Sequence, residues 1–598
     1  MFRRPLFFTL LFLAATSSLH AFEASDEAGV FQQQLAQLAS KCKELNLPEQ
    51  QAITQQWLVT VRDDQRVVYP FQNIDHYKPA ANASQLKKFW YESFMTLRRN
   101  EAERLFQQAI KIVESQPAEA YRILHRVLHE NHRHVQARKI LNYSDSSVFL
   151  LQPKPVLAKE THPFTHWKKG AYYRISTTHF DIYTDSQPAA GVKIARQIEK
   201  LYSAWQQIFV EFWCDTNILA ERFKGSNRPL YQRKRHQIIL FSSAEDYQAF
   251  FMRRKGTKVA SVGFYSDQYK YAFLYVSEPP KVGTWLHEVT HQLFYELGPQ
   301  SRDIASDQNI WALEGVAMYM ESLRDYQHFM TVGGFESFRL QFARYRNLVN
   351  RFYLPLEQLA SLGRHELTTH QEIQRLYSQS TGLAHFFMDS NRGQYRSAFF
   401  QLLNKIYTNT DTPGTLRQLS GQSFEQLDES YSQFLKVTDK QLSDIRPGTE
   451  LTALCLAHGS ITDKGLAHLK GQASINWIDL THCNISDAST ATLASMTDLN
   501  QISLEGSRVT DAIMPSLANL PDLAELDLSQ TGITDAGVLH LQGHTDLTVL
   551  WLTGTKVTNE SARVLSTLAN LQILDLSNTQ MTESTIQQVF DSLPKLDQ

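Results

Sequence analysis

The last quarter of the chain repeats one hydrophobic pattern at a fixed interval. Apolar residues recur every 24 positions, and each opens a unit such as Leu523–Asp535, in which leucines alternate with polar residues before a turn. The recurring positions are Leu451, Ile475, Leu499, Leu523, Leu547 and Leu571. Because one strand and its returning helix cannot bury their leucines alone, stacked units share a continuous core. The pattern predicts an α/β solenoid over residues 448–598.

The repeated unit resembles the leucine-rich repeat, LxxLxLxxN/C/TxL. Small groups that can bond the turning backbone occupy the N/C/T position, at Cys483, Thr531, Thr555 and Thr579. The resemblance implies a concave strand face, whose outward positions include Trp477, Asp479, Glu525, Asp527, Trp551 and Asp575. Exposed aromatic residues often anchor partners, so this face is a candidate surface for a protein or peptide. The alternative is a solvated face that serves only as a spacer.

Helical periodicity dominates residues 22–150. Helices are expected at 31–45, 85–113, 117–128 and 135–141. The last two have hairpin spacing and resemble a fragment of tetratricopeptide packing. Three histidines, His129, His132 and His134, fall between them; exposed turn residues are the favoured interpretation, with metal ligands as the alternative.

The pattern changes after a proline-containing loop near residue 160. Strand-like segments at 172–184 and 237–241 flank a helical segment at 189–209, and several helices follow residue 314. This mixture predicts one domain over residues 171–440. At 598 residues the chain is too long for a single core, so the fold class expected is multidomain α+β.

An HExxH pentapeptide, His287-Glu288-Val289-Thr290-His291, lies within a predicted helix at 284–297. Residues four apart share one helix face, so both imidazoles can reach one metal. Neutral imidazole is a good Zn²⁺ ligand, and a carboxylate beside a zinc-bound water can take its proton. These residues predict a zinc hydrolase site with Glu288 as the general base.

A third ligand is offered by Glu314, in the apolar helical segment W-A-L-E-G-V-A-M-Y at 311–319. A glutamate on such a background is seldom buried unless it is paired or bound to a metal. The alternative is a solvated glutamate on a helix face.

The HEVTH motif followed by E-G-V-A-M-Y resembles the gluzincin metallopeptidases, and most closely the bacterial peptidase-MA-like domains of unknown function. The resemblance implies Zn²⁺ held by His287, His291 and Glu314. It also implies an edge strand along which a peptide substrate can lie, for which residues 269–277 are the candidate; the alternative is an ordinary internal strand without a ligand. The chain lacks the G-A-M-E-N segment of the aminopeptidase branch, so aminopeptidase activity is not favoured.

The family logic also requires a group that stabilises the oxyanion. Tyr377 is the first candidate, with Tyr319 and His385 behind it. Each could instead be a packed helix residue.

Charge and cysteine content narrow the function classes. Net charge is −2 and no long Lys/Arg run occurs, which argues against nucleic-acid binding. The four cysteines, Cys42, Cys214, Cys455 and Cys483, are too few to staple a chain of this size and are expected to be isolated buried thiols.

The N-terminus has the parts of a secretory signal: two arginines, an apolar run at 6–15 and small residues ending at Ala21. Residues 1–21 are therefore expected to direct export to the periplasm, cell surface or medium, without stable membrane insertion; an uncleaved anchor is the alternative. Together the sequence predicts an exported zinc metallopeptidase acting on a peptide or protein. The competing hypothesis is a non-catalytic, zinc-stabilised scaffold whose leucine-rich repeats bind proteins.

Overall fold

The computed structural model describes residues 16–58, 62–70, 77–143, 153–230, 234–256, 261–299, 301, 303–326, 328–446 and 448–596. The apolar run of the expected export signal lies outside these ranges, whereas Ala21 lies in helix α1 (Thr16–Glu44). Within the described ranges, no helix has both the length and the apolar character needed to cross a membrane.

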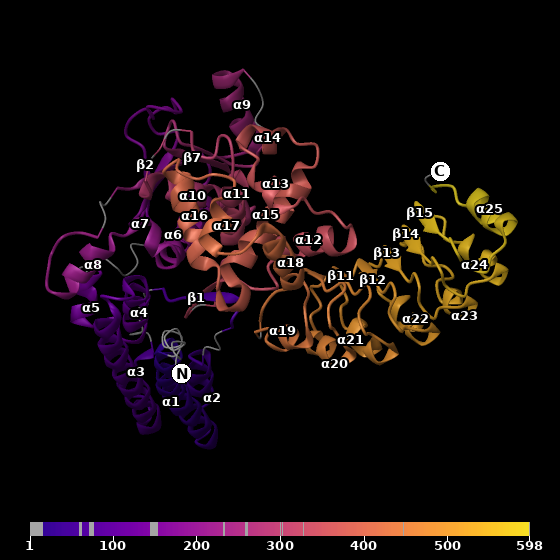
Figure 1. The fold of residues 1–598 in the computed structure, drawn as a ribbon. Coiled ribbons are helices and arrows are strands. Elements are labelled where there is room, and N and C mark those ends of the chain that lie inside the picture. Colours follow the sequence, from indigo (N-terminus) through magenta and orange to yellow (C-terminus); the bar gives the residue numbers. More distant parts are fainter. Residues whose placement is uncertain are drawn as a thin grey trace, which may run out of the picture. The chain divides into compact units, whose positions relative to one another are not determined.

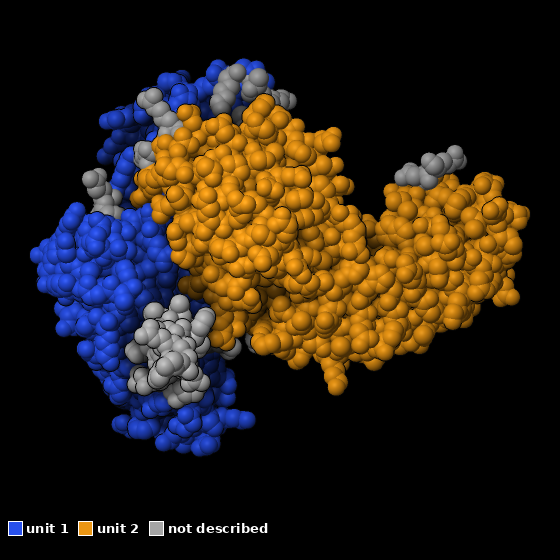
Figure 2. Space-filling view, in the orientation of Figure 1, with its two compact units in different colours: residues 1–61, 67–280, 324–331 blue, residues 62–66, 281–323, 332–598 orange. Residues whose placement is uncertain are grey.

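The chain forms two compact units (Figure 2). Each unit contains both helices and strands. Unit 1 contains residues 1–61, 67–280 and 324–331, and unit 2 contains residues 62–66, 281–323 and 332–598. The segment expected from sequence as one domain, 171–440, is divided after Pro280. The HExxH helix therefore belongs to the same unit as the repeats.

Unit 1 begins with five helices, which are α1, α2 (Pro48–Gln56), α3 (Gln85–Ile112), α4 (Pro117–Glu130) and α5 (Val135–Ile140). Phe31 and Leu35 recur one turn apart on α1 and pack with Trp90 and Phe94 of α3 in one buried cluster. Ser84 caps α3 by accepting a hydrogen bond from the Lys87 amide at 3.3 Å. Helical periodicity therefore located α3, α4, α5 and the later part of α1, whereas α2, whose buried residues Gln50 and Thr54 are polar, was not predicted.

The three histidines near α4 and α5 are buried, so the prediction of exposed turn residues is wrong. His129 stacks on Trp57, with ring centroids 5.4 Å apart. His134 caps α5, because its Nδ1 accepts a hydrogen bond from the Ala137 amide at 3.2 Å. Capping and packing account for these rings, and none of the three belongs to a described group with metal-ligand spacing.

A six-stranded mixed sheet follows in unit 1, in the order β2-β3-β4-β5-β7-β6. The strands are β2 (Pro155–Leu157), β3 (Tyr173–Ser176), β4 (Phe180–Thr184), β5 (His236–Phe241), β6 (Phe264–Ser266) and β7 (Tyr271–Tyr275). The helices are α6 (Pro188–Ile208), α7 (Val210–Trp213), α8 (Thr216–Phe223) and α9 (Ala244–Lys255). Strands β4, β5 and β7 run parallel, and α6 crosses over between β4 and β5.

Strand β7 is an interior strand, so the prediction that residues 269–277 form an edge is wrong. Phe273 pairs with Ile239 of β5 on one side and with Phe264 of β6 on the other. The short β6 precedes β7 in a hairpin and covers the side that a peptide was expected to use. The strand at that end of the sheet is therefore β6.

Unit 2 begins with a helical region. Its helices are α10 (Val282–Leu297), α11 (Ile310–Met320), α12 (Phe338–Arg344), α13 (Leu356–Ala360), α14 (Arg364–Thr369), α15 (Ile373–Asp389), α16 (Arg396–Tyr407), α17 (Thr415–Ser420), α18 (Phe424–Phe434) and α19 (Asp439–Ser443), with short helices η2 (Tyr345–Val349) and η3 (Ser390–Arg392). Of the three remaining small strands, β8 (Arg324–Asp325) belongs to unit 1, and the unit boundaries fall within β1 (Gln65–Val68) and β9 (Met330–Gly333). Helix α11 is buried along its whole length and packs against α10 and α15.

The C-terminal part of unit 2 stacks strand-and-helix turns (Figure 1). The parallel strands are β10 (Ala453–Cys455), β11 (Trp477–Asp479), β12 (Gln501–Ser503), β13 (Glu525–Asp527), β14 (Val549–Trp551) and β15 (Ile573–Asp575). The returning helices are α20 (Asp463–Leu466), α21 (Thr490–Leu493), α22 (Met514–Leu517), α23 (Asp535–Leu539), α24 (Ala562–Leu565) and α25 (Glu583–Ser592), with η4 (Ala467–Leu469), η5 (Asp487–Ser489), η6 (Asp511–Ile513) and η7 (Asn559–Ser561). Leu526 pairs with Ile502 and Leu550, so the 24-residue interval read from the sequence is the register of the sheet.

Polar contacts join neighbouring turns and also fix the backbone within each turn. The Asp511 carboxylate accepts hydrogen bonds from the Thr534 amide at 2.8 Å and from its hydroxyl at 2.6 Å, and this contact recurs along the stack. Within its own turn, the Thr555 hydroxyl donates to the Leu552 carbonyl at 2.7 Å, as expected of a small polar group at the N/C/T position of the repeat. Cys483 differs, since its Sγ lies 3.2 Å from the carbonyl of Leu456 in the preceding turn.

Of the residues expected on an open strand face, Asp479 is buried and Trp477 is packed against a neighbouring helix. Trp477 stacks against Phe342 of α12 and contacts Tyr345 edge-on, with centroids 5.5 and 5.4 Å apart. Asp479 is 2% exposed and accepts a hydrogen bond from the Thr481 amide. The prediction of an outward position is therefore wrong for Asp479, whereas Trp477 and Trp551 are both half-buried.

All four cysteines are unpaired and buried, as the sequence predicted. Burial raises the pKa of the Cys214 thiol to about 12, so this group is not a reactive thiolate at neutral pH.

Candidate metal centre

Helix α10 divides its residues between a buried face and a polar one. Trp285, Val289 and Leu293 are buried in the interior of unit 2. His287 and His291, which are half-buried, lie one turn apart on another face, with their Nε2 atoms 3.2 Å from each other. The spacing in the sequence therefore produces two converging imidazoles, as the motif predicted.

Glu314 reaches the same point from α11. This helix packs closely on α15 at Gly315, where a Cβ atom would lie 2.5 Å from the Ser380 carbonyl oxygen. The glycine after the glutamate therefore has a packing role, since any side chain there would push the two helices apart. Glu314 is 9% exposed, which rules out the solvated helix-face alternative.

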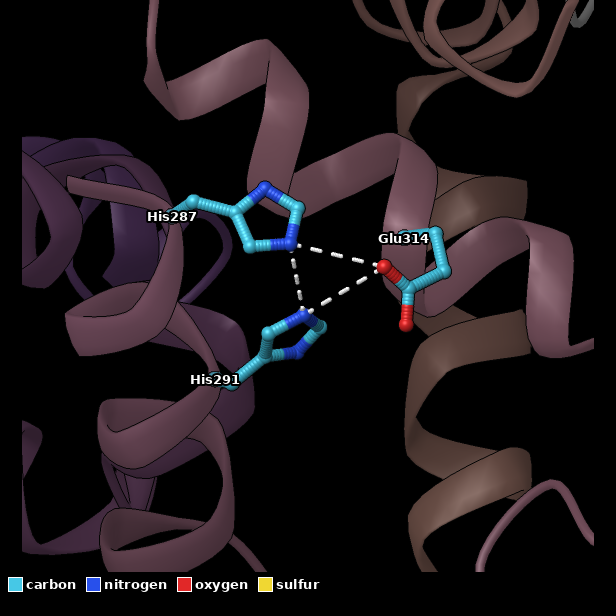
Figure 3. A group of neighbouring side chains, drawn as sticks. All are labelled: His287, His291 and Glu314. Atoms are coloured by element: carbon cyan, nitrogen blue, oxygen red, sulfur yellow. Dashed lines mark hydrogen bonds and ion pairs between the residues drawn. The ribbon is translucent and has the colours of Figure 1, made fainter. Parts of the chain in front are cut away.

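The three side chains form a compact donor set (Figure 3). The Oε2 atom of Glu314 lies 3.4 Å from Nε2 of His287 and 3.7 Å from Nε2 of His291. Donors bound tetrahedrally to zinc at about 2.0–2.1 Å lie roughly 3.3 Å apart. The distances between the donor atoms of His287, His291 and Glu314 are close to that value. Among the described residues, these three form the group whose ligand atoms are spaced to hold a metal ion.

The charges of the donor set depend on one another. Burial opposes the charged form of His287, but hydrogen bonds to Glu314 and Glu321 outweigh burial and raise the pKa of this imidazole to about 10. Burial likewise opposes ionisation of Glu314, yet the neighbouring His291 and His287 hold the pKa of its carboxyl well below the usual range. The carboxylate is therefore ionised and available to a cation.

Tyr377 of α15 adjoins this group. Its phenol lies close enough to Glu314 and Glu288 for both carboxylate charges to act on it. Burial, Glu314 and Glu288 together raise the pKa of the phenol, which is therefore protonated and able to donate at neutral pH. The first candidate for oxyanion binding thus lies beside the donor set.

The two reserve candidates lie in another cluster. The Tyr319 hydroxyl donates to Asp389 at 3.0 Å, and Nδ1 of His385 lies 3.6 Å from the same carboxylate. All three side chains are buried, and the two rings contact each other. These contacts account for Tyr319 and His385 as packed polar residues, so neither belongs to the donor set.

Sequence reasoning missed one residue of the centre, Glu321. Its Oε1 atom lies 3.1 Å from Nδ1 of His287, on the opposite edge of the ring from the donor set. Glu321 caps the C-terminus of α11, seven residues after Glu314. No local motif marks it, and only the close packing of α10 on α11 brings it to the histidine.

Comparisons with known proteins leave this centre without an assigned chemistry. Residues 281–411, which carry the donor set, match a family model described as a protein of unknown function, DUF1570. No curated protein matches the chain. Among solved structures, an internalin (inlF) from Listeria monocytogenes aligns at 25% identity with a TM-score of 0.22, covering 27% of this chain and 50% of its own. The chain thus spans about half the length of that internalin.

Proposed function

We propose that the chain is a zinc-dependent peptidase of gluzincin type. The observation that carries the proposal is the donor set: two imidazoles and one ionised, buried carboxylate at separations of 3.2, 3.4 and 3.7 Å. This combination suits zinc, and it leaves one tetrahedral position for water or substrate.

Bound there, Zn²⁺ would polarise a carbonyl and lower the pKa of water. Glu288, between the two histidines on α10, accepts the proton of the attacking water and passes it to the leaving amine. The protonated Tyr377 phenol, near Glu314 and Glu288, donates to the oxygen on which charge develops. Each role falls to a residue of unit 2.

Export and partner binding complete the proposal. The arginines and apolar run of residues 1–21 support delivery outside the cytoplasm. The stacked turns of residues 448–598 support a leucine-rich-repeat solenoid whose strand face holds a protein or peptide, with half-buried Trp551 as an aromatic anchor.

The alternative is a zinc-stabilised scaffold without turnover. One observation favours it: β7, the strand expected to receive the substrate, is paired on both sides. Against it stands Glu288, because a purely structural zinc site has no need of a base between two ligands.

Metal content and peptide turnover of the purified exported chain decide between these functions. We expect one zinc per chain and hydrolysis within a mixed peptide library, reduced roughly 10²–10⁴-fold by Glu288→Gln. Glu296→Gln is the matched control, since this glutamate of the same helix accepts from Gln292 at 2.9 Å. Stoichiometric zinc without cleavage would favour the scaffold, and absence of zinc would overturn the ligand assignment.

A further inference from the structure

We propose that Glu321 and Arg339 are positioning residues for the metal ligand His287, and that they set the affinity of the centre. The proposal rests on the zinc site argued above, but it concerns residues that no sequence motif marks. Glu321 lies outside the donor set and would influence a bound metal only through the ring of His287.

The two ring nitrogens of His287 face different groups. Nε2 faces Glu314 and His291, and Nδ1 faces Oε1 of Glu321 at 3.1 Å. A cation bound at Nε2 would displace the proton there, while the proton on Nδ1 would stay donated to the Glu321 carboxylate. Glu321 therefore selects the tautomer that can bind metal and fixes the plane of the ring.

Glu321 is itself held from two sides. Arg339 of α12 donates through Nε to Oε2 at 2.9 Å and through Nη2 to Oε1 at 3.3 Å. The Glu321 side chain is 9% exposed, so little water competes for these contacts. A bidentate guanidinium fixes both the distance and the orientation of a carboxylate.

The first turn of α10 is shaped to admit this carboxylate. A Cβ atom at Gly283 would lie 2.9 Å from Oε2 of Glu321. Its φ is not in the left-handed region, so close approach of the carboxylate, and not backbone conformation, is the reason a larger residue does not fit. The start of α10, the end of α11 and the start of α12 thus all meet at the two carboxylate oxygens of Glu321.

Metal affinity measured by competition with a chelator tests the proposal without any activity assay. Loss of an outer carboxylate partner of a ligating histidine weakens metal binding about 10–100-fold. We expect that loss for Glu321→Ala and a smaller one for Glu321→Gln, whose amide oxygen can still accept from Nδ1. Arg339→Gln, which leaves Glu321 in place but unheld, should fall between the wild type and Glu321→Ala.

Glu321→Gln and Arg339→Gln keep the experiment decisive if Glu321→Ala does not fold, because the first retains side-chain volume and the second shortens a side chain that is 49% exposed. Folding is monitored by the thermal midpoint of the metal-free chain, and Glu296→Gln serves as the control with unchanged affinity. A second readout is the visible spectrum of the Co²⁺-loaded protein, which reports ligand geometry.

The outcomes distinguish this proposal from the proposed function. Zinc affinity within about twofold of wild type in folded variants at both positions overturns the positioning role, whatever the activity. Weakened zinc binding in a chain that cleaves no peptide supports the positioning role and overturns the peptidase. A wild-type chain that binds no zinc overturns both.

Discussion

The repeat sheet and the metal centre belong to one unit but are built on opposite principles. In the sheet, each buried leucine has an equivalent 24 residues away, so one contact is made many times. At the centre, each polar contact is made once: one carboxylate faces the two imidazoles, and one further carboxylate holds the ring of His287. Substitutions in the sheet should therefore change stability and spare the chemistry, whereas those at the centre should do the reverse.

Among the predictions, a substitution of Tyr377 should have the largest effect on peptide turnover relative to its effect on stability. Tyr377→Phe keeps the ring and removes the hydroxyl beside Glu314, so peptide turnover should fall about 10²–10³-fold while the thermal midpoint changes little. Steady-state kinetics on a library-derived peptide measure the effect. Tyr353→Phe is the control, because that hydroxyl bonds Asp428 at 2.6 Å in the same unit. Unchanged turnover in Tyr377→Phe would remove this residue from the mechanism.

The converse effect is expected in the sheet at Leu526, which is fully buried in β13. Leu526→Ala should lower the free energy of unfolding by about 3 kcal/mol, since it removes apolar contacts and leaves a cavity. Zinc affinity should not change. Denaturant unfolding and chelator competition on the same sample test both parts, with Ile573→Ala as the control because Ile573 is 44% exposed in β15. A parallel loss of zinc affinity would mean that the sheet and the centre are not independent.

The same contrast explains what the sequence could predict. The 24-residue interval and the HExxH helix are local patterns, so both appeared at the predicted positions. The pairing of β6 with β7 and the approach of Glu321 to His287 depend on packing between segments, which no local pattern encodes. Burial of Asp479 was missed for a related reason, because periodicity assigns a strand face but not what covers it.

The smallest expected effect concerns Asp479 and Asp575, which occupy equivalent positions in the repeat. We expect the two carboxylates to contribute differently to stability. Burial, with further repulsion from Asp527 and Glu505, raises the pKa of the Asp479 carboxyl to about 6. A raised acid pKa means that the folded state binds the proton more tightly than the unfolded state. The stability cost is therefore present above about pH 6 and disappears below about pH 4. Asp479→Asn should add about 2 kcal/mol to the free energy of unfolding at pH 7.5 and nothing near pH 4.

Asp575, at the same position of the last strand, should respond in the opposite direction. Burial alone would raise the pKa of its carboxyl, but hydrogen bonds from Ser577 and Thr553 outweigh burial and lower it. Its charge therefore stabilises the fold at pH 7.5, and that contribution is lost as the pH falls through the folded-state pKa. Urea unfolding of Asp479→Asn and Asp575→Asn across this pH range should give changes of opposite sign at pH 7.5. Changes of the same sign would show that position in the repeat, and not the local surroundings of each carboxylate, determines its contribution.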